Sequence, residues 1–259
     1  MSETPRARDY AVKTVERALS LLDLFTFRTP ERTFTELCRE TGLSKATVKR
    51  LVHTLETHRY LERDERTGRY RLGLKLFQLG NVVAAHLEVR SRALPYLQKL
   101  RDRTGETVVL ISFSEGQQVY LEKLEGLGTV RITAQVGTIR TPFHGLGKVL
   151  LAFLEPGAVE KLLPPGDLPR FTMNTICDRQ EFLEHLRSIR KNGYGIDDEE
   201  YIEGVTAVGA PVFDSTGKIL AAVGVLGPSM RMCGERLAEV VELTKRAAET
   251  ISQQLGSAI

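Results

Sequence analysis

The sequence predicts an α+β protein, with an N-terminal winged helix-turn-helix followed by a larger domain of antiparallel strands flanked by helices. Three helical patterns and two short alternating segments within residues 8–73 indicate the first domain. Strand-like runs mixed with helical ones over residues 90–259 indicate the second. The charge divides similarly, with a net +5 over residues 1–80 and −2 over residues 81–259. This asymmetry suggests separate partners for the two parts.

Composition excludes several classes of protein. The chain has 259 residues, 42% hydrophobic and 27% charged, which is typical of a folded protein. No apolar run approaches the ~18–20 residues that span a bilayer, so we expect no membrane partner. Cys38, Cys177 and Cys233 are far apart, which argues against a disulfide framework or a cysteine-rich zinc site and favours a cytoplasmic location. The histidines show no metal-ligand spacing, so neither a metal nor a cofactor is predicted.

The first two helices have clear sequence signals at their ends. Apolar residues recur at helical spacing over residues 15–25. Thr33 is a predicted N-cap, and Glu36 three residues later completes a capping box over a short second helix. We expect Gly42 to end this helix and Ser44 to cap the next one. This order of helix, tight turn and helix is typical of a helix-turn-helix.

The third helix, predicted over residues 45–58, has the composition of a DNA recognition helix. One side is apolar and must face a small core: Val48, Leu51, Val52 and Leu55. The other side is short and polar, which suits the major groove. The residues that we expect at DNA are Ser44, Lys45, Ala46, Thr47, Lys49, Arg50 and His53. A solvated amphipathic helix is the alternative, and the caps and glycine turn before the helix favour DNA binding.

A basic hairpin is predicted after this helix, with strands over residues 59–63 and 68–72. Its arginines suit phosphate or minor-groove contact: Arg63, Arg66, Arg69 and Arg71. The caps, the recognition helix and this wing together predict double-stranded DNA as the partner of the first domain.

The remaining patterns give a linker over residues 74–89 and a second domain over residues 90–259. Helices are predicted over residues 74–86, 90–104, 147–154, 179–191 and 235–255. Strands are predicted over residues 107–113, 118–123, 130–135, 207–213 and 219–226. The last two strands flank a turn at residues 214–217, which predicts a hairpin.

Two stretches of the second domain have the features of a small-molecule site. The glycine-containing loop 141–147 opens into a helix that begins near Lys148. Free backbone N–H groups at a helix start can hold a carboxylate, and glycine permits close approach. Asp197 opens an acidic run, residues 197–200, and could accept a hydrogen bond from a ligand hydroxyl. A solvated acidic loop is the alternative interpretation of this run.

Over nearly its full length the sequence resembles the IclR family of bacterial transcriptional regulators. The matching stretches are Lys13–Leu19, Leu37–Leu55, Arg69–Gly73, Thr104–Val108, Pro142–Lys148, Gly193–Glu200 and Ala210–Asp214. Their number, order and spacing make the match specific. The resemblance implies a helical linker between the winged helix-turn-helix and a GAF-like ligand-sensing domain. It also implies homodimers, or dimers of dimers, on a palindromic DNA operator.

The resemblance also implies which residues contact an effector: Gly145, Leu146, Asp197, Ala207, Gly224 and Leu226. Members of the family that bind small keto-acids tend to have thiol or hydroxyl side chains at the last three positions. Here Ala207 and Gly224 are expected to leave room and Leu226 to add an apolar wall. We therefore hypothesise a larger, partly apolar carboxylic acid, aromatic or branched. Arg131 and Arg140 are candidate partners for its carboxylate.

Two other functions fit the sequence less well. An enzyme is disfavoured because the sequence has no G-x-S-x-G, H-E-x-x-H or phosphate-loop motif, so no catalytic residues are assigned. His144 beside Asp197 could form an acid–base pair, but no nucleophile is evident. An architectural DNA-binding protein without a ligand would not need a second domain of this size.

Overall fold

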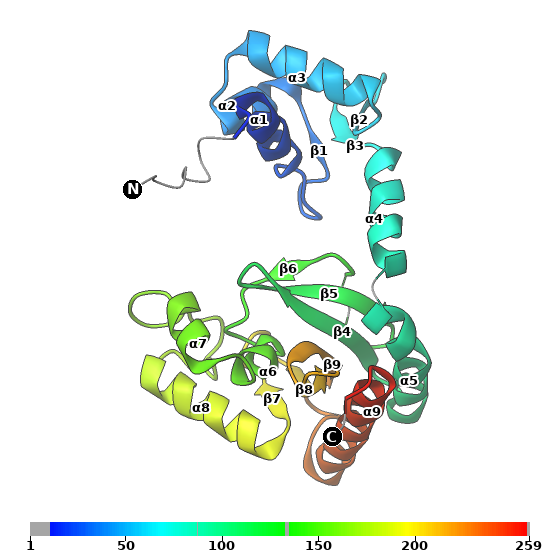
Figure 1. Cartoon of the computed structure of the whole chain (residues 1–259), viewed down its shortest axis with the longest axis vertical. Helices are drawn as coiled ribbons and strands as arrows, with labels where there is room; N and C mark the ends of the chain where they lie inside the picture. Colours follow the sequence, from blue (N-terminus) through cyan, green and yellow to red (C-terminus); the bar gives the residue numbers. More distant parts are fainter. Residues whose placement is uncertain (1–10, 87, 133–134, 258–259) are drawn as a thin grey trace, which may run out of the picture. The chain divides into compact units, whose positions relative to one another are not determined.

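A computed structural model of the chain describes residues 11–86, 88–132 and 135–257. It divides into two compact units, Met1–His86 and Leu87–Ile259, which Figure 1 colours along the sequence. The first unit is mainly helical, and the second contains a six-stranded antiparallel sheet with helices on both faces. The predicted α+β class is confirmed. None of the helices in these described ranges is both long and apolar enough to cross a bilayer.

The first unit is a helix-turn-helix with a three-stranded sheet. Its elements are α1 (Lys13–Leu22), β1 (Glu31–Arg32), α2 (Phe34–Thr41), α3 (Lys45–Thr57), β2 (Leu61–Arg63), β3 (Tyr70–Leu72) and α4 (Leu74–His86). Strand β3 lies between β1 and β2 and pairs antiparallel with both. The two-residue β1 is too short to give a periodic signal, and the sequence did not predict it.

The predicted caps of this unit are confirmed. The Thr33 hydroxyl accepts the backbone N–H of Glu36 at 3.2 Å, and the Glu36 carboxylate accepts the backbone N–H of Thr33 at 2.7 Å. Gly42 ends α2 with a left-handed φ of 65°, and the Ser44 side chain caps α3. Helices α2 and α3 therefore begin where a side chain satisfies a free backbone N–H group. Leu21, Leu37, Val48 and Leu61 are fully buried between these elements.

The second unit begins with a helix that leads into the sheet. Its elements are α5 (Glu88–Thr104), β4 (Thr107–Ser114), β5 (Gln117–Leu124), β6 (Ile139–Arg140), α6 (Gly147–Ala152), α7 (Pro156–Leu162), α8 (Arg179–Asn192), β7 (Gly195–Asp198), β8 (Val205–Phe213), β9 (Ile219–Pro228) and α9 (Gly234–Gln254). The strand order is β6-β5-β4-β9-β8-β7, and every neighbouring pair is antiparallel. The hairpin β8–β9 is confirmed at the predicted place.

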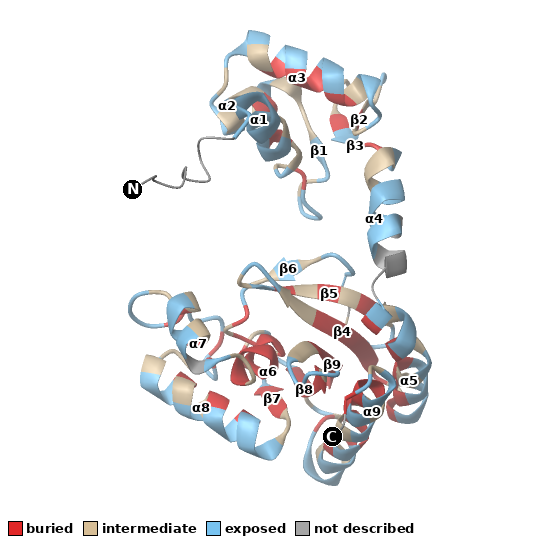
Figure 2. Ribbon diagram, viewed as in Figure 1, coloured by how far each residue is buried: buried red, intermediate tan, exposed pale blue. Residues whose placement is uncertain are grey.

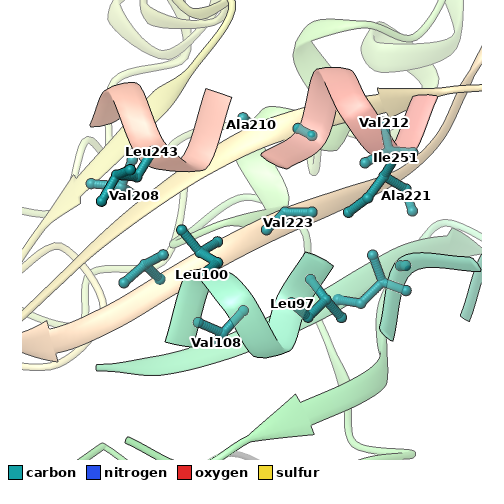
Figure 3. Packing of buried hydrophobic residues seen from close by; sticks show 14 of the residues in the cluster. Leu97, Leu100, Val108, Val208, Ala210, Val212, Ala221, Val223, Leu243 and Ile251 are labelled. Atoms are coloured by element: carbon teal, nitrogen blue, oxygen red, sulfur yellow. The ribbon is translucent and has the colours of Figure 1, made fainter. Parts of the chain in front are cut away.

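Alternation along the central strands gives the sheet two apolar faces. Figure 3 shows one of them, where Val108, Val208 and Val223 pack with Leu97 of α5 and Leu243 of α9. The residues next to these valines along each strand, Val109, Ala207 and Ala222, face the other way, toward α6, α7 and α8. Figure 2 shows the resulting buried layers along β4, β8 and β9. Because both faces are covered, these strands are almost continuously buried.

The structure differs from the interpretation of the sequence in three places. Residues 130–132 and 135 are not in a strand, and residues 133–134 lie outside the described ranges. The outer partner of β5 is instead β6, which pairs Arg140 with Gln118. Asp197 lies in β7 at the edge of the sheet, rather than in a loop. Helix α7 was not predicted.

Candidate functional site

The polar face of α3 is exposed, as a recognition helix requires. Lys45, Ala46, Lys49, Arg50 and His53 are exposed, and the apolar stripe behind them is buried. Ser44 and Thr47 have a local task as well. The Ser44 hydroxyl accepts the backbone N–H of Thr47 at 3.2 Å and lies 2.9 Å from its hydroxyl. They order the first turn, which leaves the longer side chains after them free to reach a DNA groove.

The arginines of the wing differ in their surroundings. Arg71 and Arg69 each lie beside a glutamate, at 3.1 and 3.9 Å, and the guanidinium of Arg63 lies over the ring of Tyr70. Arg66 is exposed at the turn of the hairpin, with no carboxylate of the described residues within ion-pair distance. Arg66 is therefore the wing residue whose charge is least neutralised within the first unit.

A pocket lies on the side of the sheet that faces α6. It is lined by Gln118, Tyr120, Ile132, Arg140, Thr141, His144, Gly145, Leu146, Asp197, Tyr201, Ile202, Val205, Ala207 and Leu226. Its free space is narrow, about 40 Å³, within a hollow of about 530 Å³ that includes the open mouth. The structure thus gathers five of the six residues expected at an effector: all except Gly224.

Strand register explains why residues distant in sequence meet here. Asp197 of β7 lies opposite Ala207 of β8, and Ala207 lies opposite Leu226 of β9. In adjacent antiparallel strands, residues directly opposite one another share a face of the sheet. These three side chains therefore form one row, which runs from the edge of the sheet toward its centre and makes one wall of the pocket.

The sixth residue, Gly224, lies beneath the Leu146 side chain. A Cβ atom at Gly224 would lie 2.1 Å from Leu146 Cδ1, and one at Gly209 would lie 2.9 Å from Cδ2. These two glycines face each other across β8 and β9 and let Leu146 sit against the sheet. The expectation that Gly224 leaves room for a ligand is wrong in this structure, because Leu146 fills that room.

Asp197 is held in place from below and lies directly against Gly145. Its Oδ1 accepts the backbone N–H of Glu200 at 2.8 Å. A Cβ atom at Gly145, whose φ is 59°, would lie 3.2 Å from Oδ2. Burial raises the pKa of Asp197, although nearby Lys148 and the N–H groups of Glu200 and Tyr201 favour the charged form. The sequence suggested that a ligand carboxylate could lie beside Gly145. In the structure this space is next to the carboxyl group of Asp197.

Lys148 is fully buried beneath the pocket and joins three segments. Its ammonium group donates to both carboxylate oxygens of Glu200 and to the backbone oxygen of Ile196, at 3.2 Å for the latter. It also lies 3.1 Å from His185 Nε2 on α8. Because Glu200 in turn donates its N–H to Asp197, this ion pair positions the turn that carries Asp197. This role of Lys148 has no local signal in the sequence, since its partner Glu200 lies 52 residues away.

Arg140 is the cation that faces the pocket. Its guanidinium lies 5.5 Å from the centre of the Tyr120 ring and 4.8 Å from that of Tyr201. No carboxylate lies within ion-pair distance of it in the described parts of the chain. The other candidate, Arg131, is exposed, is paired with Glu125 at 3.2 Å, and does not line the pocket.

His144 lines the pocket with a buried ring that packs edge-on against Phe171 and parallel to Tyr201. Its Nε2 is buried and has no hydrogen-bond partner among the described residues. Burial, together with the charge of nearby Lys148, lowers the pKa of His144 to about 4. The imidazole is therefore neutral near pH 7 and offers one donor and one acceptor nitrogen.

Comparison with known proteins assigns both units to one family. The model of the IclR helix-turn-helix domain matches residues 14–65, and that of the bacterial transcriptional regulator IclR C-terminal region matches residues 81–253. The two matches follow the same order as the two units of the structure. They cover both the exposed face of α3 and the pocket residues.

Full-length relatives and solved structures agree with these matches. The transcriptional regulator XynR of Escherichia coli is 34% identical over 95% of this chain and 98% of its own, and KipR of Bacillus subtilis is 32% identical over 94% and 97%. The crystal structure of an IclR-type regulator from Alicyclobacillus acidocaldarius superposes with a TM-score of 0.85, at 29% identity, over 95% of this chain and 100% of that one. The chain belongs to the IclR family of transcriptional regulators.

Proposed function

We propose that this protein is a ligand-responsive regulator that binds a palindromic DNA operator and senses a small carboxylic acid in its second unit. The observation that carries the proposal is the pocket, where Arg140 lacks a carboxylate partner among the described residues. The planar donors of an arginine suit a carboxylate, and Arg140 lies close to the rings of Tyr120 and Tyr201 that line the same space. The exposed polar face of α3 supplies the second requirement, a surface for the major groove.

The lining supports an effector that is partly apolar. Leu146, Val205, Ala207 and Leu226 form one side, and Tyr120 adds an aromatic surface. Such walls favour a branched or aromatic acid over a very small one. Because the free space is only about 40 Å³, a ring-sized ligand requires side chains at the mouth to move outward.

Apolar side chains on the first unit support a homodimer, or a dimer of dimers. On α1 and just before it, Val12, Val15 and Leu19 are more than half exposed, and so are Leu74 and Phe77 on α4. Exposed apolar groups at helical spacing form stripes that a second copy can cover. Two copies of α3 would then address two half-sites of a palindrome, about one helical turn or a multiple of it apart.

A thermal-shift screen of the full chain against small carboxylic acids tests the sensor function. A ligand that binds only the native state stabilises it by about 2.7 kcal/mol when its concentration is 100 times Kd. We expect aromatic or branched acids to raise the unfolding temperature, and expect Asp197→Ala to abolish the rise. Electrophoretic mobility of operator DNA, with and without the hit, then measures the coupling. A hit that leaves operator affinity unchanged contradicts regulation by this pocket.

A further inference from the structure

The polar groups of the pocket carry different charges. Arg140 supplies a cation beside Tyr120 and Tyr201. Asp197 supplies a carboxylate beside Gly145, and His144 supplies a neutral imidazole with an unpartnered Nε2. Lys148, the other nearby cation, is occupied by Glu200 and lies beneath the pocket. The charged groups that a ligand meets in this space are therefore one cation and one carboxylate. Beside them are the unpartnered imidazole nitrogen and the neutral polar side chains of Gln118 and Thr141.

This arrangement fixes how an acid can lie. A ligand carboxylate beside Gly145 would approach Asp197 Oδ2 and meet either a like charge or the cost of neutralising it. The same carboxylate beside Arg140 forms a charge-assisted pair. The end of the ligand that reaches Asp197 must then be a hydrogen-bond donor, because a charged carboxylate oxygen only accepts.

The unpartnered nitrogen of His144, the residue next to Gly145, adds a second requirement. Buried polar atoms in native proteins almost always have a partner, and one without a partner calls for an explanation. A hydroxyl group can donate to a carboxylate and also bond to an imidazole nitrogen. A hydroxyl placed between Asp197 and His144 would satisfy both, which a methyl group or a second carboxylate would not.

We propose that the effector is a monocarboxylate with a hydroxyl group at its far end, the carboxylate lying on Arg140 and the hydroxyl between Asp197 and His144. This inference rests on the proposed function and adds the direction and the second functional group of the ligand. It predicts that plain acids bind weakly and that dicarboxylates of the same length bind least.

Calorimetric titration of the full chain with two matched series tests the proposal: benzoate, 4-hydroxybenzoate and terephthalate, and butyrate, 4-hydroxybutyrate and succinate. In the series that binds, we expect the hydroxy acid to bind about 10- to 100-fold more tightly than the plain acid. We expect the dicarboxylate to bind most weakly. Asp197→Asn keeps an acceptor for the Glu200 N–H but removes the charge, so the dicarboxylate should gain on the hydroxy acid by at least about tenfold.

Three variants complete the test. His144→Phe retains a ring against Phe171 and should remove the preference for the hydroxyl. Arg140→Gln should weaken every acid, and Arg131→Gln, its matched control on the surface, should weaken none. Equal binding of plain and hydroxy acids, or an unchanged ranking in Asp197→Asn, overturns this inference and leaves the proposed function intact. Binding of none of the six acids, together with a thermal-shift screen in which no carboxylic acid stabilises the chain, overturns the carboxylic-acid sensor itself.

Discussion

The ion pair between Lys148 and Glu200 should stabilise the second unit only while both partners are present. Their side chains are 1% and 8% exposed. Removing one partner of a buried pair leaves an uncompensated charge and typically costs about 3–5 kcal/mol. We expect Lys148→Met and Glu200→Met each to lower the free energy of unfolding by that amount. Burial raises the pKa of Glu200. In Lys148→Met the unpaired Glu200 could therefore take up a proton and reduce the cost, and measurement at pH 8 limits this protonation.

The double variant should cost less than either single one. With both charges gone, an apolar pair of similar volume avoids the desolvation cost. The remaining loss comes from the Ile196 carbonyl and His185 Nε2, which lose the Lys148 ammonium group. Leaving such polar groups unpaired costs about 1–3 kcal/mol. The double variant should therefore be at least about 2 kcal/mol more stable than the sum of the two single effects implies.

Urea denaturation with hydrogen exchange provides the assay. Exchange read at the amides of α6 and β7 reports the second unit separately, which matters because a chain of two units need not unfold in one step. Glu239 on α9 provides the control, because it is exposed and pairs with Arg236, so Glu239→Met should cost less than about 1 kcal/mol. Strict additivity of the Lys148 and Glu200 substitutions would refute the reasoning.

Three further predictions follow from other parts of the chain. Gly147→Ala should destabilise by about 1–3 kcal/mol, because its Cβ would lie 2.6 Å from backbone atoms. Gly157→Ala is the control, because a Cβ there meets no atom within 4 Å and should not destabilise the protein. Thermal unfolding of the two variants measures the difference. Arg50→Ala should weaken specific DNA binding by about 1–3 kcal/mol, whereas Arg66→Ala should weaken all sequences alike and reduce the salt slope by about 1; equal losses for Arg50→Ala on random DNA would make it a phosphate contact. Burial and a neighbouring lysine lower the pKa of His185 to about 4. Between this value and the ~6.5 of the unfolded chain only the unfolded state binds the proton, so native stability falls as pH falls. Between pH 7 and pH 5, the free energy of unfolding measured by urea titration should fall by about 1–2 kcal/mol less in His185→Gln than in the unsubstituted protein. Equal falls in the two proteins would contradict the lowered pKa of His185.

Local signals were sufficient to predict the first unit. The capping box at Thr33, the left-handed Gly42 and the Ser44 cap each depend on residues within four positions. The same holds for the turn between β8 and β9, where the Asp214 side chain accepts backbone N–H groups at 2.8 and 3.1 Å. Sequence patterns predict such features because the interacting groups are close along the chain.

The pocket depends on contacts between distant segments, which explains the errors there. The run that begins at Asp197 has the composition of a solvated loop, yet it forms β7 because the adjacent β8 provides backbone partners. Lys148 is buried only because Glu200 compensates its charge. Gly224 suggested free space, and the space is taken by Leu146 from a segment about 80 positions earlier. The residue types indicated where the pocket lies. Which side chains fill the space around it depends on packing between segments that are distant in the sequence.

The two faces of the sheet give the pocket a physical route to the start of the second unit. Ala207 lines the pocket, and the next residue along β8, Val208, packs in the opposite core with α5 and α9. A ligand that displaces β8 or β9 therefore acts through a single layer of backbone on α5, the helix that begins directly after α4. Packed interiors transmit such shifts because they have little free volume. Under the proposed function, a ligand alters operator affinity only by the difference in its own affinity for the two arrangements, so operator DNA would change the affinity for the ligand by the same factor.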